Sequence, residues 1–239
     1  MPDQKMPLAS GLIEAEFIAR PNRFLSKVKI DGVVHDSHVP DPGRLKELLF
    51  PGARVLVEPK SGAERKTKFA TVMVYSGDEL ISINSQLPNQ FVRFCFDNEL
   101  IPEFSDWRVK KQEYTLGKSR FDFLLEKDGL EKLVEVKSAT LVEEGLARFP
   151  DAVTARGTKH VNHLLASITP KRSAAVLFIV QRSDATHFEP HWERDPVFAS
   201  ALKNAVEQGL ELIIYTTHLK PDSMTLGDSI PYSLGQDHA

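Results

Sequence analysis

An unbroken apolar run, Ala174 to Val180, limits the possible folds of this chain more than any other segment. A strand with one face in water alternates apolar and polar residues, so this run predicts a strand that is buried on both faces. Seven residues are far too few to span a bilayer, and the N-terminus lacks the apolar stretch of a secretory signal. We therefore expect a central strand of an α/β sheet and neither a membrane protein nor an exported one.

The pattern around this run is that of an α/β domain, which we place at residues 85–220. Phe91, Phe94 and Cys95 lie on one face of a helix expected over 89–101. The other expected elements are a strand near 109–116, two strands on either side of a turn at 127–129, a loop over 140–156, a helix over 158–167, the buried strand 174–181, a helix over 196–208 and a strand over 210–215. Residues 221–239 have the composition of a polar, loosely ordered tail.

The first 84 residues show short strands broken by Pro and Gly. The expected strands are 12–19, 24–30, 33–38, 54–58, 69–75 and 80–83. This density of short strands predicts a small β-barrel, either of the OB type or of another small-barrel type. A short helix is expected over 42–49, with Asp41 as its N-cap and Pro42 at its first position.

A predicted hairpin carries the residues with the clearest chemistry. The strand from Arg120 alternates, so Asp122 lies opposite the face of its apolar neighbours, and Asp128-Gly129 suits a tight turn. Glu135 and Lys137 are two apart on the second strand and point the same way. The hairpin can therefore bring these three side chains together.

Two carboxylates beside each other are suited to a hard cation such as Mg²⁺ or Mn²⁺. Such a cation activates water and polarises phosphate, while a lysine stabilises developing charge. The arrangement of Asp122, Glu135 and Lys137 predicts metal-assisted phosphodiester chemistry. The alternative is an ordinary exposed strand face, where Glu-x-Lys is common.

In the order of its elements this domain resembles the PD-(D/E)xK nuclease superfamily. Nearly the whole chain resembles the sugar fermentation stimulation protein A family. The runs that carry the second resemblance are 20–24 (RPNRF), 38–45 (HVPDPGRL), 119–125 (SRFDFLL), 134–138 (VEVKS), 149–152 (FPDA), 156–160 (RGTKH) and 178–182 (FIVQR). Where many family members have Cys-Pro-Asn-Thr-Gly, this chain has Val-Pro-Asp-Pro-Gly at 39–43, so no role of that Cys or Asn transfers.

The family resemblance implies an OB-like N-terminal domain, a nuclease-like C-terminal domain, non-specific DNA binding and a regulatory part in maltose metabolism. The nuclease-like triad matches at Asp122, Glu135 and Lys137. The resemblance supports a metal site and DNA as partner, and leaves open whether the protein is an enzyme.

Further residues are candidates for contact with the DNA backbone or for support of this site. Arg156, Lys159 and His160 begin a predicted helix, where cations and the helix N-terminus attract phosphate. The alternative is a polar helix face. Glu113 is a candidate on the preceding strand, and Gln181 ends the buried strand.

Asp151, in the predicted loop, is a candidate for a second cation, although an Asp after Pro more often forms a turn.

Cations in the predicted barrel are candidates for nucleic-acid binding. They are Arg23, Arg44, Arg65 and Lys66. Cations neutralise the phosphate backbone and aromatic rings stack on bases, although a charge run is often only a solvated face. We expect Phe24, which lies among them in sequence, to belong to the barrel core.

Composition bounds the remaining choices. The net charge of −3 argues against a chain coated in nucleic acid, and Cys95 is the single cysteine, which excludes an internal disulfide and a Cys-based zinc site. We expect a cytoplasmic, largely sequence-independent DNA-binding protein with a nuclease-like metal site. The alternatives are a regulatory DNA-binding factor with an inactive site and, with less support, a protein–protein interaction module.

Overall fold

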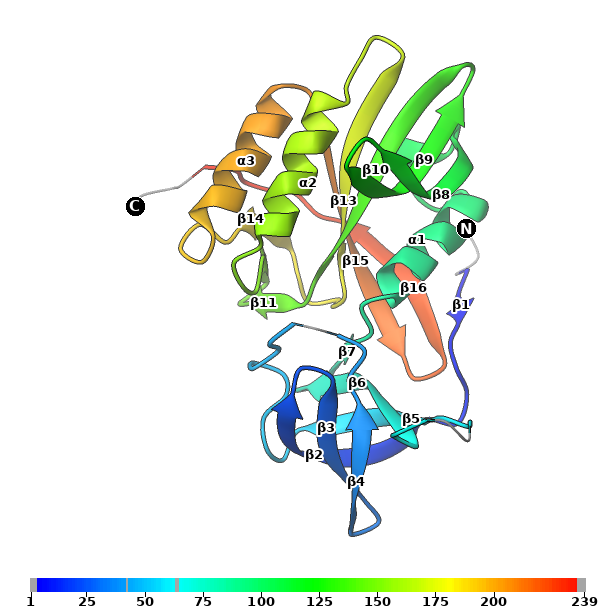
Figure 1. The fold of residues 1–239 in the computed structure, drawn as a ribbon, viewed down its shortest axis with the longest axis vertical. Coiled ribbons are helices and arrows are strands. Elements are labelled where there is room, and N and C mark those ends of the chain that lie inside the picture. Colours follow the sequence, from blue (N-terminus) through cyan, green and yellow to red (C-terminus); the bar gives the residue numbers. More distant parts are fainter. Residues whose placement is uncertain (1–3, 42, 63–64, 236–239) are drawn as a thin grey trace. The chain divides into compact units, whose positions relative to one another are not determined.

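The computed structural model describes residues 4–41, 43–62 and 65–235. The chain forms two compact units (Figure 1). The barrel unit contains the chain up to Leu87 together with 181–184 and 217–225. The sheet unit contains the remaining residues, from Pro88 onward, and the two units are described separately.

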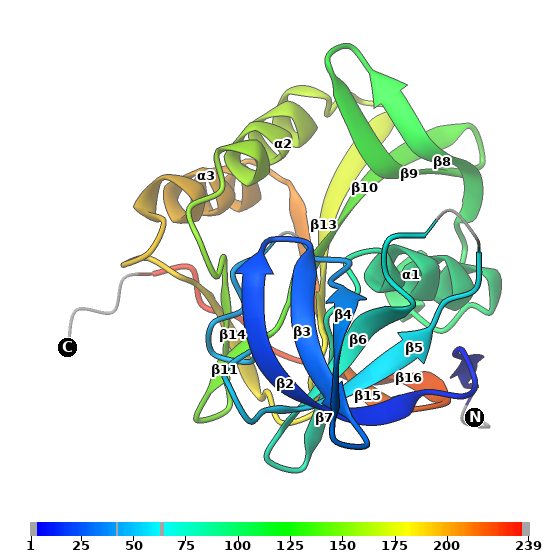
Figure 2. The same cartoon turned by 60° about the horizontal axis from the view of Figure 1, so that its bottom comes forward.

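The barrel unit is built from six strands in the order β4-β3-β2-β5-β6-β7, and a further pairing of β4 with β6 closes five of them into a barrel (Figure 2). The strands are β2 (Ile13–Asn22), β3 (Leu25–Ile30), β4 (Val33–His38), β5 (Arg54–Pro59), β6 (Phe69–Ser76) and β7 (Glu79–Ser82). Ala15 and Phe17 alternate inward along β2 and join a core that includes Val28 and Val55. These strands agree with the six expected from the sequence.

The helix expected over 42–49 is absent. Leu45 has a φ of +47°, which is not helical, and only a turn forms over 46–48. Leu45, Leu48 and Leu49 are buried in the barrel core, so their apolar spacing reflects packing and not a helix. Pro42, the expected first helical residue, lies outside the described residues.

The sheet unit contains a mixed sheet with the order β1-β16-β15-β13-β10-β9-β8, whose first strands extend into residues of the barrel unit. β9 pairs antiparallel with both β8 and β10, whereas β13 pairs parallel with both β10 and β15. The strands are β1 (Met6–Pro7), β8 (Arg108–Leu116), β9 (Ser119–Lys127), β10 (Leu130–Ala139), β11 (Leu141–Glu143), β12 (Leu146–Phe149), β13 (Arg172–Val180), β14 (His187–Pro190), β15 (Glu211–Lys220) and β16 (Ser223–Ser229). The helices are α1 (Leu87–Asp97), η1 (Pro102–Phe104), α2 (Ala155–Ala166) and α3 (Pro196–Glu207).

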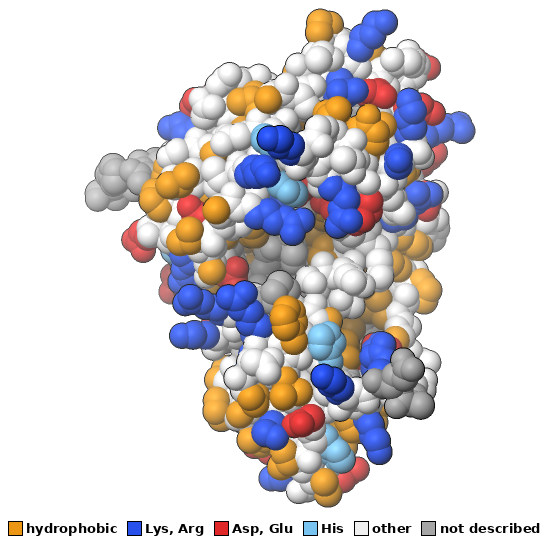
Figure 3. Space-filling model, viewed as in Figure 1, with side chains coloured by type: hydrophobic (Ala, Val, Ile, Leu, Met, Phe, Trp, Pro, Cys, Tyr) orange, Lys and Arg blue, Asp and Glu red, His pale blue; other side chains and the backbone are white. Residues whose placement is uncertain are grey.

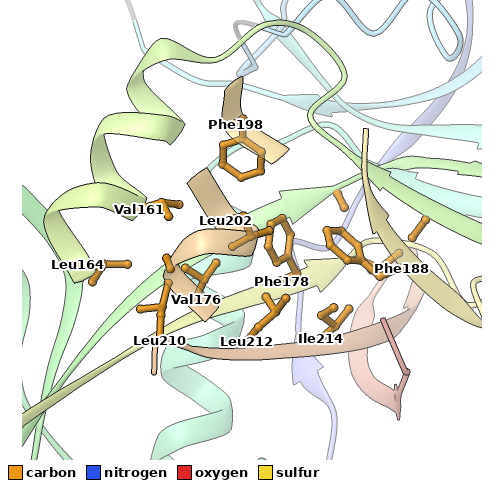
Figure 4. Close-up of a cluster of buried hydrophobic side chains, with 14 of the residues drawn as sticks. Val161, Leu164, Val176, Phe178, Phe188, Phe198, Leu202, Leu210, Leu212 and Ile214 are labelled. Carbon is orange, nitrogen blue, oxygen red and sulfur yellow. The ribbon is translucent and has the colours of Figure 1, made fainter. Parts of the chain in front are cut away.

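The apolar run predicted as a central strand is β13, and all seven of its residues from Ala174 to Val180 are fully buried. Its even-numbered residues pack into one core with α2, α3 and β14. Figure 4 shows Phe178 of β13 between Leu202 of α3 and Phe188 of β14. This packing fixes β10, the parallel neighbour of β13, which carries Glu135 and Lys137.

Three sequence expectations for this part of the chain are wrong. The expected loop over 140–156 contains the hairpin of β11 and β12, whose tight turn is Glu144-Gly145 with positive φ at both residues. The expected helix over 89–101 instead begins at Leu87 and ends at Asp97. The tail after Lys220 is not loosely ordered, because Ser223–Ser229 forms β16 and Met224 is buried opposite Met6 of β1. Residues 236–239 of the expected tail lie outside the described part of the chain.

Within the described ranges, no helix is both long and apolar enough to cross a membrane.

Candidate functional site

The hairpin of β9 and β10 sets the register of the candidate site. Asp128 and Gly129 have φ of +49° and +80°, the values that a tight type I′ turn requires. The strands pair from this turn to Val134 opposite Phe123. The next residues along the two strands are Glu135 and Asp122. The turn therefore sets the register that places the two carboxylates near each other, as the sequence predicts.

Asp122 is held on both oxygens. One oxygen accepts a hydrogen bond from the backbone N–H of Val136 at 2.8 Å, and the other from the side-chain amide of Asn89 in α1 at 2.7 Å. Burial raises the pKa of Asp122 to about 6, and the charge of Glu135 adds to the rise against these hydrogen bonds and the charge of Lys137. The two carboxylates are therefore close enough to influence each other's ionisation.

Glu135 is buried, and one of its carboxylate oxygens contacts two nitrogen-bearing side chains. Its Oε1 lies 2.5 Å from Nζ of Lys137 and 2.6 Å from Nδ1 of His160 in α2. Burial alone would raise the pKa of Glu135, but the hydrogen bond to His160 and the charge of Lys137 outweigh it and lower the pKa. The other oxygen, Oε2, is buried and accepts no hydrogen bond from any residue that the structure describes.

The donor set fits a hard divalent cation. A buried carboxylate oxygen without a donor is costly unless it has another partner, and a cation shared with Asp122 would be such a partner. The described residues contain no group of three or more His, Cys, Asp or Glu side chains that could hold a metal ion. A cation here would rely on two carboxylates, with backbone oxygen or water completing its shell.

The structure brings together part of the predicted support for this site. Arg156 and Lys159 are exposed on the first turns of α2 and line one open pocket with His160. His160 is buried, and its described partner is Glu135. Sequence reasoning did not find the contacts of Asn89 and His160, because a helix and a strand distant in sequence carry the two partners.

Other candidates are placed elsewhere. Glu113 is exposed on β8 and forms an ion pair with Arg120 at 2.8 Å, so the structure does not bring it to Asp122. Asp151 lies in the loop before α2, where its backbone carbonyl accepts a hydrogen bond from Arg194. Gln181 is buried directly after β13 and groups with the barrel unit.

The predicted nucleic-acid-binding cations of the barrel unit are all exposed. Arg20 holds the backbone of two of them, since its guanidinium donates to the backbone carbonyls of Arg23 and Arg44 at 2.7 and 2.8 Å. Arg65 and Lys66 lie together in the segment between β5 and β6. The cations therefore occupy exposed segments between strands.

Phe24 was expected in the barrel core, and this expectation is wrong. Its side chain is 53% exposed and stacks on the ring of His38, with ring centres 6.4 Å apart. The turn before β3 causes this, since Asn22 accepts a hydrogen bond from the N–H of Phe24 and His38 bonds to its carbonyl. A fixed, exposed aromatic ring lies beside Arg23.

Family models match both parts of the chain. A family model described as the sugar fermentation stimulation protein RE domain matches residues 86–223, and the corresponding N-terminal OB domain matches residues 18–83. The chain belongs to the sugar fermentation stimulation protein family.

Curated relatives in this family include homologues from two strains of Clostridium botulinum. The homologue of strain Hall is 40% identical over 94% of this chain and 98% of its own length, and that of strain Alaska E43 is 42% identical over 92% and 96%. A solved structure, that of Pyrococcus furiosus SfsA in complex with Ca²⁺, matches with a TM-score of 0.88 and 28% identity, covering 96% of this chain and 99% of that one. The predicted fold class, an OB-type barrel followed by a mixed sheet flanked by helices, is confirmed.

Proposed function

We propose that this protein binds DNA largely without regard to sequence and hydrolyses phosphodiester bonds at a divalent-metal site formed by Asp122 and Glu135. The observation that carries the proposal is the buried Oε2 of Glu135, which has no hydrogen-bond donor among the described residues and lies in a site shared with a second carboxylate. We assign DNA binding to residues 1–84, the nuclease-like chemistry to residues 85–220 and no role to the segment 221–239.

The proposed cation is Mg²⁺ or Mn²⁺. The related archaeal protein was solved in complex with Ca²⁺, which, like Mg²⁺, takes oxygen ligands. A bound Mg²⁺ or Mn²⁺ would supply Lewis-acid polarisation of the phosphate and a lowered pKa for the attacking water. Asp122 and Glu135 supply the negative charge that holds such an ion.

Lys137 contributes a positive charge inside the site. Its ammonium is largely buried and lies 2.5 Å from Glu135. A buried cation stabilises negative charge that develops on a pentacovalent phosphate far better than an exposed one does. Lys137 is therefore the catalytic residue of this proposal, and Asp122 and Glu135 are the ligands.

Exposed cations account for the binding of DNA. Arg23, Arg44, Arg65 and Lys66 in the barrel unit, and Arg156 and Lys159 in the sheet unit, are free to contact phosphates. Phosphate contacts supply affinity without reading bases, so binding weakens with salt and varies little with sequence. We place this activity in the cytoplasm.

Cleavage of nucleic acid by purified protein tests the proposal. Wild type is incubated with Mg²⁺ or Mn²⁺ and a panel of single-stranded and duplex DNA and RNA. Lys137→Ala should reduce cleavage about 100-fold or more, the size of effect seen when one charge-stabilising group is lost, and should leave DNA affinity nearly unchanged. Lys111→Ala, at an exposed position on β8, is the control and should cleave normally. No cleavage by wild type on the whole panel would remove the enzymatic half of the proposal.

The alternative is a regulatory DNA-binding factor for sugar metabolism, such as that of maltose, with an inactive nuclease-like site. The described residues favour it in one respect, because they hold no cluster of three metal-binding side chains. Footprints on promoter DNA distinguish the two. Protection at defined sites that persists in a chelator would favour the regulatory factor.

A further inference from the structure

An open pocket of about 590 Å³ lies at the start of α2 in the sheet unit. Its lining comes from two separate segments, the β8–β9 hairpin and the first turns of α2. The lining residues are Lys118, Arg120, Ala155, Arg156, Lys159 and His160. Four of the six carry a permanent positive charge and none carries a negative one.

Three of these four cations have no ion-pair partner among the described residues. Arg120 forms an ion pair with Glu113, but Lys118, Arg156 and Lys159 form no ion pair with any other residue that the structure describes. Figure 3 shows Lys and Arg side chains gathered with a histidine over the face where α2 lies in Figure 1. Like charges that converge on one pocket repel each other, so the arrangement favours an anion that neutralises them.

The pocket adjoins the candidate metal site through one residue. His160 lines the pocket, and its Nδ1 lies 2.6 Å from Oε1 of Glu135. The imidazole of His160 therefore lies between the pocket and the carboxylate that would hold the metal. The helix dipole of α2 adds partial positive charge at its N-terminus, which begins at Ala155.

We propose that this pocket binds a phosphate group of the nucleic-acid strand, next to the phosphate that reacts. The inference rests on the proposed function and deepens it, because it names a group of the substrate that is held but not cleaved. Either an internal phosphodiester or a terminal phosphate has this chemistry. Holding a neighbouring phosphate fixes the strand relative to Glu135, and reaction rates depend strongly on such positioning.

Binding without divalent metal tests the pocket apart from catalysis. Anisotropy of a labelled single-stranded oligonucleotide is measured over a range of salt concentrations for wild type and for Arg156→Gln/Lys159→Gln. The matched control is Lys171→Gln/Lys203→Gln, which removes the same charge at two positions of the same unit that form no described ion pair. The pocket variant should bind about 10-fold more weakly with a salt slope lower by about one, as expected for loss of one phosphate contact, and the control should stay within about 2-fold.

Comparing circular, linear and end-phosphorylated strands distinguishes an internal phosphodiester from a terminal phosphate. If the loss is the same on a closed single-stranded circle as on a linear strand, the pocket holds an internal phosphodiester. If the loss appears only on strands with a 5′- or 3′-phosphate, it holds a terminal one. Equal losses in the pocket and control variants, with wild type binding well, would overturn the pocket but not the proposed function. Absence of binding by wild type at low salt would overturn both.

Discussion

The carboxylate of Asp122 accepts a hydrogen bond from the backbone N–H of Val136 at 2.8 Å. This bond fixes a side chain of β9 to the backbone of β10 midway between Glu135 and Lys137. The relative position of the candidate catalytic groups is therefore set by the pairing of β10 with β9 on one side and with β13 on the other, and not by flexible surface side chains. Rigid placement of this kind is what a metal site requires.

The pH dependence of stability in metal-free protein should show the free-energy cost of ionising the buried carboxyl group of Asp122. Its pKa rises from 3.8 to about 6 on folding, chiefly through burial. The folded state then binds the proton more tightly than the unfolded state, so stability falls as pH rises between these values, by at most about 3 kcal/mol. Urea unfolding from pH 4.5 to 7 should show wild type losing stability relative to Asp122→Asn over this window.

Asn at this position keeps an acceptor for Val136, and the Asn89 amide can reverse to accept from it, so the comparison isolates the charge. Asp78→Asn, at an exposed turn, is the control and should follow the wild-type curve. A parallel course of wild type and Asp122→Asn over the whole range would contradict the predicted cost of the Asp122 charge.

His160 should act as a positioning residue for Glu135. Loss of its hydrogen bond in His160→Ala should weaken Mn²⁺ binding about 10- to 100-fold, the usual effect of removing a group that orients a metal ligand. His160→Gln retains an N–H donor and should recover part of the affinity. Isothermal titration with Mn²⁺ measures both variants, and unchanged affinity in His160→Ala would contradict the assignment.

Gly157 should be intolerant of any side chain. A Cβ there would lie 2.7 Å from the side chain of Thr154, the N-cap of α2, and 3.3 Å from the ring of Phe198 in α3. Gly157 also donates its N–H to the Thr154 hydroxyl that caps α2. Gly157→Ala should therefore cost about 1 to 3 kcal/mol of stability through overpacking. Urea unfolding measures this, with Thr158→Ala on the same turn as a control that should cost less.

Phe24 should contribute to single-strand binding by stacking on a base. Phe24→Ala should leave the barrel folded, because the ring is exposed, and should weaken binding of single-stranded DNA by about 1 to 3 kcal/mol. Phe50→Ala is a matched control, since Phe50 is 52% exposed in the same unit and has no described ring contact. Equal effects of the two substitutions in an anisotropy titration would exclude a specific role for Phe24.

Local patterns predicted most of the elements. The run from Ala174 to Val180 predicted β13 because burial on both faces removes the polar alternation, and Asp128-Gly129 predicted the hairpin because the turn requires positive φ. The short helix over 42–49 was predicted wrongly, because tertiary packing of Leu45 in a left-handed conformation outweighs local helical preference.

Contacts between distant segments could not be predicted. Asn89 reaches Asp122 across 33 positions and His160 reaches Glu135 across 25, and neither pair has a spacing that marks it. Met224 belongs to β16, which lies between β15 and β1, and β1 comes from the other end of the chain. Phe24 is exposed because a turn holds its backbone, although its residue type favours burial.

An Mn²⁺-soaked crystal structure tests the metal site most directly. Anomalous scattering locates Mn²⁺ independently of the protein atoms. We predict a single strong peak that bridges the carboxylates of Asp122 and Glu135, with Oε2 of Glu135 as a ligand and Nζ of Lys137 close by. No peak between these carboxylates at saturating Mn²⁺, with Asp122 still bonded to Val136 and Asn89, would contradict the proposed site.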